Sequence, residues 1–264
     1  MTVTATPTPV GAEIRRWREL RSLSQMALAA VAEVSTRHLS YIETGKSQPT
    51  SSMILRLADA LDVPIGEQNE LLLVGGFAPK HPERDFDDEQ LSSVMASLRN
   101  LLDAHEPYPA LLMDDHWDVV DANRPIDALL VGCHPDLLTP PINVIRLTLH
   151  PQGLAPRIRN LVTWRNHLLH QLEQRIVRSG GDPRLRELLA EVAAYSTGGM
   201  HSEPPVDPAV LLELSTSDGA LRLFSMSSRI EGPADVTLDS LHLETFMPAD
   251  EDTRHHLSGL LRNE

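Results

Sequence analysis

Apolar residues at helical spacing dominate the first third of the chain. Val10, Ile14 and Trp17 recur every three or four residues, which predicts a helix with one buried side. Ser24 and Ser35 precede the next two helical stretches, and serine is a favoured N-cap because its side-chain oxygen accepts a backbone N–H. The pattern therefore predicts closely spaced short helices in this part of the chain.

Two further helices complete the N-terminal region. Ser51 or Ser52 is expected to begin a fourth helix, and a fifth covers residues 65–74. Gly45 is expected to end the third helix and Gly75-Gly76 the fifth, because glycine tolerates the left-handed backbone of a helix C-terminus. We therefore expect a loose Thr/Pro-rich tail at 1–9, five helices within 10–79, and a charged linker at 80–88.

The pattern changes its period after a sixth helix at 91–104. Apolar residues at 110–113 and 117–120 flank a polar turn, which predicts a β-hairpin. Asn123 is expected to cap a short helix, and residues 155–195 to form two longer helices. The glycine and proline pairs at 198–199 and 204–205 indicate a loop.

A second β-hairpin is predicted at 210–226. Asp218-Gly219 is a favoured two-residue turn, and pairing outward from it makes one face largely apolar. This pairing puts Thr216 opposite Leu221, Leu214 opposite Leu223 and Leu212 opposite Ser225. With a strand at 241–247 and a closing helix at 251–261, residues 89–264 are expected to form an α+β domain with an antiparallel sheet.

Charge divides the chain into the same two parts. The 264 residues carry a net charge of −14. Residues 10–60 hold seven cations against five anions, whereas residues 81–264 hold 15 against 29. This balance excludes a protein that coats nucleic acid with its whole surface, but it allows a small DNA-reading module on an acidic body.

Several other classes are excluded on composition and motif. The single cysteine, Cys133, leaves no internal disulfide framework. The N-terminus lacks the basic and apolar segments of a signal peptide, and no run approaches the ~18 apolar residues that span a bilayer. We therefore expect a cytoplasmic protein without a membrane partner.

Residues 24–46 carry a recognisable series of short motifs. S-Q-x-x-L-A begins at Ser24, V-S occupies 34–35 and I-E-T-G-K occupies 42–46. In this order they resemble the helix-turn-helix of phage-repressor-like (Xre-type) transcription regulators, and A-D-A-L-D-V-P at 58–64 fits as well. The resemblance implies a five-helix lambda-repressor-like domain with double-stranded DNA as its partner.

The resemblance also implies roles for individual side chains. The N-terminal end of the third helix would reach base edges in the major groove, where Arg37 could bind O6 and N7 of a guanine. Gln25 would lie near a phosphate, since a helix N-terminus favours an anion, and Lys46 would contact the backbone on the other side. The expected DNA-binding residues are Gln25, Ser35, Thr36, Arg37, His38, Ser40, Tyr41, Lys46 and Ser47.

Three further residues of this module are not expected to contact DNA. Arg18 and Glu43 match an ion pair that joins the first and third helices of such domains, a structural role. Glu33 stands where the turn between the second and third helices usually has glycine, and a positive φ there costs about 1 kcal/mol. Since the local charge is modest, a homodimer on a palindromic operator is expected to double the phosphate contacts.

The acidic body carries a second resemblance. The stretch 109–123 resembles the opening of a PAS-type sensor fold. N-V-I-R-L at 143–147, G-D-P at 181–183, D-V-T-L at 235–238 and E-T-F-M-P-A-D at 244–250 resemble the ligand-binding domain of actinobacterial MmyB-like regulators. That family implies an apolar pocket for a fatty-acid-like ligand.

The candidate wall residues of such a pocket are the large apolar side chains of the body. Their alternative interpretation is ordinary core, because most aromatic residues are buried whatever the function. The candidates are Trp117, Trp164, Leu168, Leu214, Leu223, Phe224 and Phe246.

Neither a metal site nor catalysis is indicated. His167, His170 and Glu173 lie three residues apart, but they lack the i, i+4 pair of zinc motifs, so a solvated helix surface is expected. The chain has no G-x-S-x-G, no glycine-rich phosphate loop and no Cys-x-x-Cys, so we expect neither an enzyme nor a cofactor.

The sequence thus predicts a sequence-specific DNA-binding regulator, a one-component sensor whose C-terminal domain binds an apolar small molecule. The alternative is a regulator whose C-terminal domain is only a dimerisation or protein-interaction module.

Overall fold

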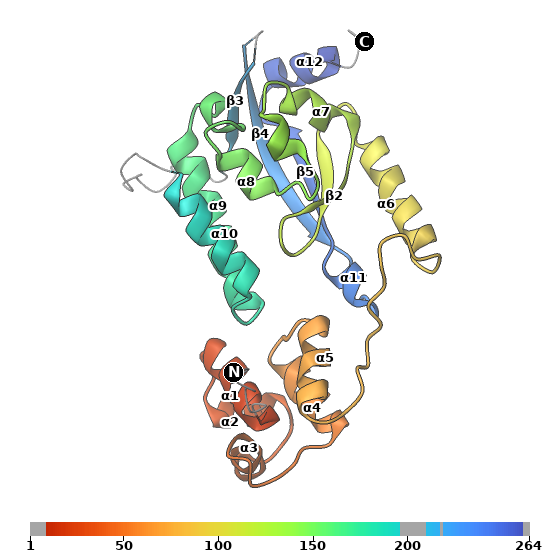
Figure 1. The fold of residues 1–264 in the computed structure, drawn as a ribbon, viewed down its shortest axis with the longest axis vertical. Coiled ribbons are helices and arrows are strands. Elements are labelled where there is room, and N and C mark those ends of the chain that lie inside the picture. Colours follow the sequence, from red (N-terminus) through yellow and green to blue (C-terminus); the bar gives the residue numbers. More distant parts are fainter. Residues whose placement is uncertain (1–8, 196–209, 217–218, 261–264) are drawn as a thin grey trace, which may run out of the picture. The chain divides into compact units, whose positions relative to one another are not determined.

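The computed structural model describes residues 9–195, 210–216 and 219–260, and it contains two compact units (Figure 1). Unit 1 comprises the chain up to Arg84 together with Ile176–Gly181 and Gly232–Asp239. Unit 2 comprises the remaining segments, which begin at Asp85, Asp182 and Ser240. The expected tail at 1–9, apart from Pro9, and the expected loop at 198–205 lie outside the described residues.

Unit 1 contains the five predicted N-terminal helices. They are α1 (Val10–Leu20), α2 (Gln25–Val31), α3 (Thr36–Glu43), α4 (Ser51–Ala60) and α5 (Ile65–Val74). The Ser24 hydroxyl accepts the Ala27 N–H at 3.0 Å and the Ser35 hydroxyl accepts the His38 N–H at 3.1 Å, so both expected caps are present. The helical N-terminal fold is confirmed.

The fourth helix begins at Ser51, as predicted, and its cap is the residue before it. Thr50, rather than Ser51 or Ser52, has the extended backbone of an N-cap and accepts the Met53 N–H. Ser51 is already the first helical residue. Thr50, Ser51 and Ser52 all carry a hydroxyl group that can cap a helix, so the sequence alone did not identify which of them does so.

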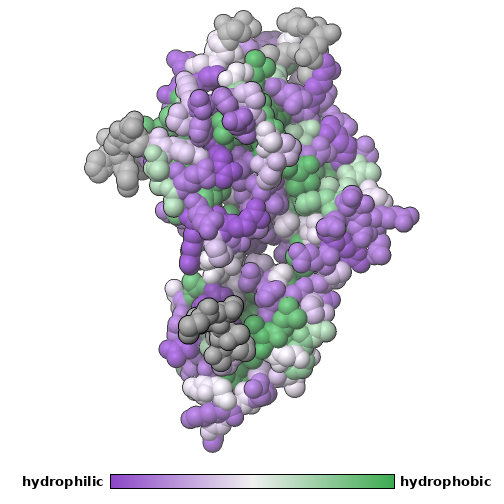
Figure 2. Space-filling view, viewed as in Figure 1, coloured by the Kyte–Doolittle hydropathy of each residue, from purple (hydrophilic) through white to green (hydrophobic). Residues whose placement is uncertain are grey.

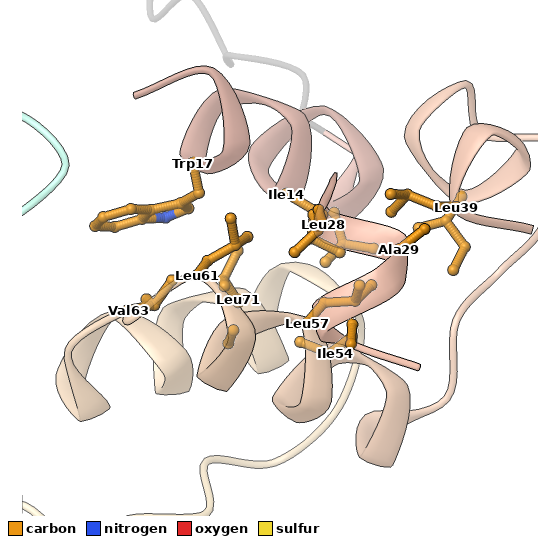
Figure 3. Packing of buried hydrophobic residues seen from close by; sticks show 14 of the residues in the cluster. Ile14, Trp17, Leu28, Ala29, Leu39, Ile54, Leu57, Leu61, Val63 and Leu71 are labelled. Carbon is orange, nitrogen blue, oxygen red and sulfur yellow. The ribbon is translucent and has the colours of Figure 1, made fainter. Parts of the chain in front are cut away.

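One apolar cluster fills the space between these helices (Figure 3). Ile14, Leu28 and Leu57 are fully buried at its centre. The helices approach closely at Gly11, where a Cβ would lie 1.9 Å from the Ile42 carbonyl oxygen. The contact of α1 with α3 therefore requires a residue without a side chain at position 11. The short helix α11 (Val236–Asp239) also packs on α5 in this unit.

Unit 2 is an α+β domain built on a five-stranded sheet, as predicted. The strands are β1 (Ala110–Met113), β2 (Val119–Ala122), β3 (Leu212–Thr216), β4 (Gly219–Arg229) and β5 (His242–Pro248). Their order is β2-β1-β5-β4-β3, and every neighbouring pair is antiparallel. β5 is therefore the central strand, although it is the last in sequence.

Helices and short 3-10 turns complete unit 2. α6 and the α9–α10 pair lie on opposite sides of the sheet in the view of Figure 1, and α12 contacts β4, β5 and α7. The helices are α6 (Ser92–Ala104), α7 (Arg124–Leu130), α8 (Val144–Leu149), α9 (Leu161–Arg178), α10 (Pro183–Ala194) and α12 (Glu251–Leu260), with 3-10 turns η1 (Pro135–Leu138) and η2 (Ala155–Arg157). Within the described ranges, no helix has both the length and the apolar character to cross a bilayer.

The predicted register of the β3–β4 hairpin is wrong by two residues. Leu212 pairs with Leu223, and Leu214 with Leu221. Thr216 faces Gly219, so the connection is 217–218, which lies outside the described residues, rather than Asp218-Gly219. Because side chains alternate with a period of two, the shift leaves every residue on its predicted face.

The first hairpin also differs from its prediction. Trp117 belongs to the turn and not to β2: its φ is +68°, and its N–H donates to the Asp114 carbonyl at 3.1 Å. β2 begins two residues later, at Val119. The Trp117 carbonyl accepts the Val144 N–H at 2.8 Å, so this turn connects to the start of α8.

Candidate nucleic-acid interface and ligand cavity

The third helix presents a polar side to solvent. Thr36, Arg37 and Tyr41 are exposed, whereas Leu39 and Ile42 are buried in the cluster of unit 1. The other expected DNA-binding residues share this surface or its edges, with Ser35 and Lys46 exposed and Gln25, His38, Ser40 and Ser47 half-buried. Figure 2 shows mostly hydrophilic atoms over α3 and the loop after it.

Two cationic side chains lie against the Tyr41 ring on this surface. The Arg37 Nε donates to the Tyr41 hydroxyl at 3.0 Å, and its guanidinium lies 5.3 Å from the ring centroid. The Lys46 Nζ lies 5.9 Å from the same ring. The Arg37–Tyr41 hydrogen bond uses one of the five guanidinium donors, so the other four remain available for the expected base contact.

A buried ion pair supports the helix from behind. Arg18 Nε and Nη2 donate to the two Glu43 carboxylate oxygens at 2.7 and 2.9 Å, a bidentate geometry. Both residues are more than nine-tenths buried, and the hydrogen bond to Glu43 raises the pKa of Arg18. The Arg18 Nη1 also donates to the Leu23 carbonyl, so the pair joins α1, the turn before α2, and α3.

Gln25 and Glu33 are two further residues of this module for which the sequence made a prediction. The Gln25 amide donates to a Glu43 oxygen at 2.7 Å, which fixes the side chain expected to lie near a phosphate. Glu33 has a φ of +54°, the left-handed backbone expected for a residue at a glycine position.

A cavity of about 150 Å³ lies within unit 2, between the sheet and its helices. β1 and β5 contribute Leu111, Met113 and Phe246, and α9 contributes Trp164 and Leu168. The remaining lining residues come mainly from the β1–β2 hairpin, α7, α8, β3 and β4: Trp117, Val119, Ala122, Ile126, Asp127, Leu129, Leu130, Ile142, Val144, Leu147, Thr148, Leu154, His167, Gln171, Leu212, Ser225 and Glu244.

Four of the seven candidate wall residues line this cavity: Trp117, Trp164, Leu168 and Phe246. Leu214 and Leu223 are fully buried but lie in the ordinary core, the alternative considered for them. Phe224 follows Leu223 on the strand and is half-buried away from the lining. Strand alternation puts Leu223 and Phe224 on opposite faces, so both could not have faced one cavity.

Polar groups in the wall were missed at the sequence level. Glu244 on β5 pairs with Leu111 on β1 and with Ser227 on β4, so its carboxyl lies on the cavity side with Leu111. Burial raises the pKa of Glu244, against the hydrogen bonds of Ser225 and Ser227. The alternation of His242, Glu244 and Phe246 was the available signal for a shared face.

The side of the cavity formed by α9 adds two polar side chains, those of His167 and Gln171. His167 Nε2 lies 2.7 Å from the Gln171 amide nitrogen, and burial, with His170 nearby, lowers the pKa of His167. His170 and Glu173 are exposed, as expected for a helix surface. Among the described residues, no group of three or more His, Cys, Asp or Glu side chains could hold a metal ion.

A separate polar cluster joins the β1–β2 turn to the start of α10. Asp182 accepts the Arg184 N–H at 2.7 Å as the N-cap, and a second Asp182 oxygen lies 2.9 Å from His116 Nε2. The hydrogen bond to Asp114 and the one to Asp182 raise the pKa of His116, while burial and Arg184 act against them.

Comparison with known proteins gives two domain matches. Residues 9–71 match a family model described as a helix-turn-helix domain, and residues 94–260 match one described as the MmyB-like transcription regulator ligand binding domain. The two matches coincide with the α3 surface and with the domain that holds the cavity.

Individual relatives give narrower matches. HTH-type transcriptional regulators of Mycobacterium bovis and Mycobacterium tuberculosis are 32% identical over 108 residues, which cover 41% of this chain and 38% of theirs. The matched part is thus well under half the length of these relatives. The solved structure of an RNA-binding Light-Oxygen-Voltage receptor aligns over 95% of this chain and 63% of its own, with 13% identity and a TM-score of 0.27.

Proposed function

This chain belongs to the MmyB-like transcription regulators, and we propose that it is a one-component sensor that binds operator DNA through α3 and an apolar small molecule through the cavity of unit 2. The exposed polar side of α3 supports the first half, and the apolar lining of the cavity supports the second. The proposal assigns no catalysis to the chain.

The DNA-binding part of the proposal predicts that replacing Arg37 and replacing Lys46 affect DNA affinity differently. Arg37→Ala removes a base-reading fork and should weaken operator binding by about 1–3 kcal/mol while it leaves non-specific binding almost unchanged. Lys46→Ala removes a phosphate contact and should weaken both about equally. Fluorescence anisotropy with an operator and a scrambled duplex measures the two effects. Equal losses in both variants would remove Arg37 from base reading.

We propose further that the regulator binds a palindromic operator as a homodimer. Its helix-turn-helix segment carries few cations, so two copies would supply phosphate contacts that one copy lacks. Light scattering of the free protein and of the operator complex tests this. A single copy bound per operator would contradict it.

For the sensor half, we propose a fatty-acid-like ligand, a molecule with an apolar body and a polar end. The cavity carries the proposal, because an empty apolar cavity is costly and a purely dimerising domain does not need one. The ligand must bind one state of the regulator better than the other to change operator affinity. Native mass spectrometry should find a small apolar molecule bound, and its removal should change operator affinity in a gel-shift titration.

A further inference from the structure

We propose that Tyr41 determines the sequence specificity of the DNA-binding surface by presenting only one edge of the Arg37 guanidinium to the bases. The inference rests on the proposed DNA-binding function and specifies how α3 reads a guanine. Three observations carry it: the hydrogen bond between the two side chains, the position of both on the exposed side of α3, and the contacts of Tyr41 with the loop that carries Lys46.

The hydrogen bond engages one edge of the guanidinium. Arg37 Nε donates to the Tyr41 hydroxyl at 3.0 Å. A guanidinium has two edges that each offer a pair of parallel N–H groups, one formed by Nε and Nη2 and the other by Nη1 and Nη2. Because Nε is engaged, the edge of Nη1 and Nη2 is the one that can donate two hydrogen bonds to O6 and N7 of a guanine.

The spacing of the two residues keeps this arrangement on the exposed side of α3. Residues four apart lie on the same side of a helix, and both Arg37 and Tyr41 are exposed. The phenol is neutral, so the contact orients the guanidinium without cancelling its charge. Arg37 therefore keeps its attraction for DNA, while the rotational freedom that it would lose on binding a base is already reduced.

Tyr41 also positions Lys46, the residue expected to contact the DNA backbone. The Tyr41 carbonyl accepts the backbone N–H groups of Lys46 at 2.8 Å and of Ser47 at 3.1 Å. Gly45, whose φ is +70°, provides the turn that directs the chain back toward Tyr41. The Lys46 Nζ lies 5.9 Å from the Tyr41 ring centroid, within the range of a cation–π attraction. Tyr41 thus connects the expected base contact of Arg37 to the expected phosphate contact of Lys46.

The orientation of Arg37 should separate base reading from phosphate binding. A freely rotating arginine can use either edge on a phosphate as well as on a base. Arg37 held by Tyr41 keeps one complete edge, and that edge is directed by the hydrogen bond to the hydroxyl. Removing the hydroxyl should therefore weaken binding to the preferred sequence and leave binding to other duplexes undiminished.

The test begins with selection from a random-sequence duplex library by the whole wild-type protein. The selected duplex and a scrambled version of it are then the probes for fluorescence anisotropy. Tyr41→Phe removes the hydroxyl and keeps the ring and the backbone contacts. We expect affinity for the selected duplex to fall about three- to tenfold, the effect of one hydrogen bond, and affinity for the scrambled duplex not to fall. Tyr108→Phe, which removes a hydroxyl in unit 2, is the matched control and should bind like the wild type.

A double-mutant cycle with Arg37→Ala distinguishes positioning from direct contact with DNA. If Tyr41 acts through Arg37, adding Tyr41→Phe to Arg37→Ala should cause no further loss of affinity. Selection repeated with Tyr41→Phe should relax the base preference at the same position as selection with Arg37→Ala, and at no other. A structural role of the hydroxyl would instead lower affinity for both duplexes, with or without Arg37.

The outcomes separate the two levels of the proposal. If the wild type selects no sequence from the library, the DNA-binding function fails together with the inference. If it selects one, and Tyr41→Phe either binds like the wild type or further weakens Arg37→Ala, the inference alone is overturned. Proton–nitrogen NMR of the unmodified protein adds a measurement that needs no Tyr41 variant. The Arg37 Nε–H should exchange with water more slowly than that of Arg186, an exposed arginine of α10, and equal rates would overturn the inference.

Discussion

Glu43 connects α3, the helix proposed to read DNA, to the two helices that precede it. Its carboxylate is shared by the Arg18 guanidinium and the Gln25 amide, which come from α1 and α2. A buried carboxylate of this kind is tolerated because its hydrogen-bonding capacity is satisfied from several directions. The residues proposed to read DNA thus depend for their position on a buried group behind the helix.

Removing the partner of this carboxylate should be strongly destabilising. Arg18→Met is expected to lower the free energy of unfolding by about 3–5 kcal/mol, because it leaves Glu43 charged, buried and without its ion pair. Hydrogen exchange of α1–α3 peptides measures the loss locally. Arg15→Met is the control, since Arg15 pairs with Glu19 at an exposed site and its loss should have little effect. Similar losses in both variants would contradict the role of burial.

Sequence reasoning succeeded best where a residue acts on its own backbone or on its neighbours in the chain. Ser24 and Ser35 cap helices, and Glu33 has a positive φ, as local pattern alone indicated. Glu244 was missed because its environment is created by strands far apart in the sequence. A local pattern identifies what a residue does within its own stretch of chain, but it does not reveal what surrounds a side chain in the folded domain.

At the scale of elements, the sheet shows which strand pairings the sequence predicts and which it does not. Both hairpins could be predicted because their strands are neighbours in sequence, but the pairings of β5 with β1 and β4 could not. Ala110 pairs with Thr245, and no turn signal links residues so distant. The cavity depends on those pairings, which is why four of its wall residues were predicted and most were not.

Asn123 joins three elements instead of capping one. Expected as the side-chain cap of α7, it makes no such hydrogen bond. Its amide donates to the carbonyls of Leu102 and Tyr108, and its oxygen accepts the Ala110 N–H. The prediction of a helix start was therefore right for the backbone, whereas the side chain connects α6 to the first strand.

Asn123→Ala should consequently cost more than a lost cap. It removes three hydrogen bonds to backbone groups, of which the Leu102 carbonyl keeps the His105 N–H, and we expect the free energy of unfolding to fall by about 2–4 kcal/mol. Chemical denaturation of the whole chain, followed by circular dichroism, measures the change. Asn100→Ala on the exposed side of α6 is the control and should be nearly neutral. A loss near 1 kcal/mol would indicate a simple cap.

His116 should make the junction of the β1–β2 turn with α10 sensitive to pH. Because Asp114 and Asp182 raise its pKa in the folded state, its stabilising effect is complete below the unfolded pKa of about 6.5. The effect is lost as the pH rises through the folded pKa. The stability difference between the wild type and His116→Gln should therefore be larger at pH 6 than at pH 8.5.

Denaturation at the two pH values tests this sign. The difference between the two proteins isolates His116 from groups such as His242, whose pKa is lowered by burial and which therefore contributes in the opposite direction. His255→Gln, at an exposed position on α12, provides the control. A wild-type advantage that grows toward pH 8.5 would contradict the assignment.

At the scale of the whole molecule, the distribution of charge limits how strongly the protein attracts DNA. The chain carries a net charge of −14, and its cationic surplus is confined to the helix-turn-helix segment. Attraction to DNA must therefore come from a few local contacts, which makes affinity dependent on copy number and on salt.

The salt dependence of operator binding should reveal how many copies take part. Lys46→Ala removes one proposed phosphate contact per copy, and each such contact contributes about one unit to the slope of log affinity against log salt. We expect the slope to fall by about two for a homodimer. A fall of about one would indicate a single copy. Anisotropy titrations between 50 and 200 mM salt measure the slope.

The hairpin of β3 and β4 implies how this domain tolerates changes in length. Its observed pairing is displaced by two residues from the one that the turn chemistry favoured, and yet the same leucines face inward. Inserting two residues between Thr216 and Gly219 should therefore leave the core intact. A single insertion that propagates into β4 would turn its leucines toward water, so variation among related chains at this site should come in even steps.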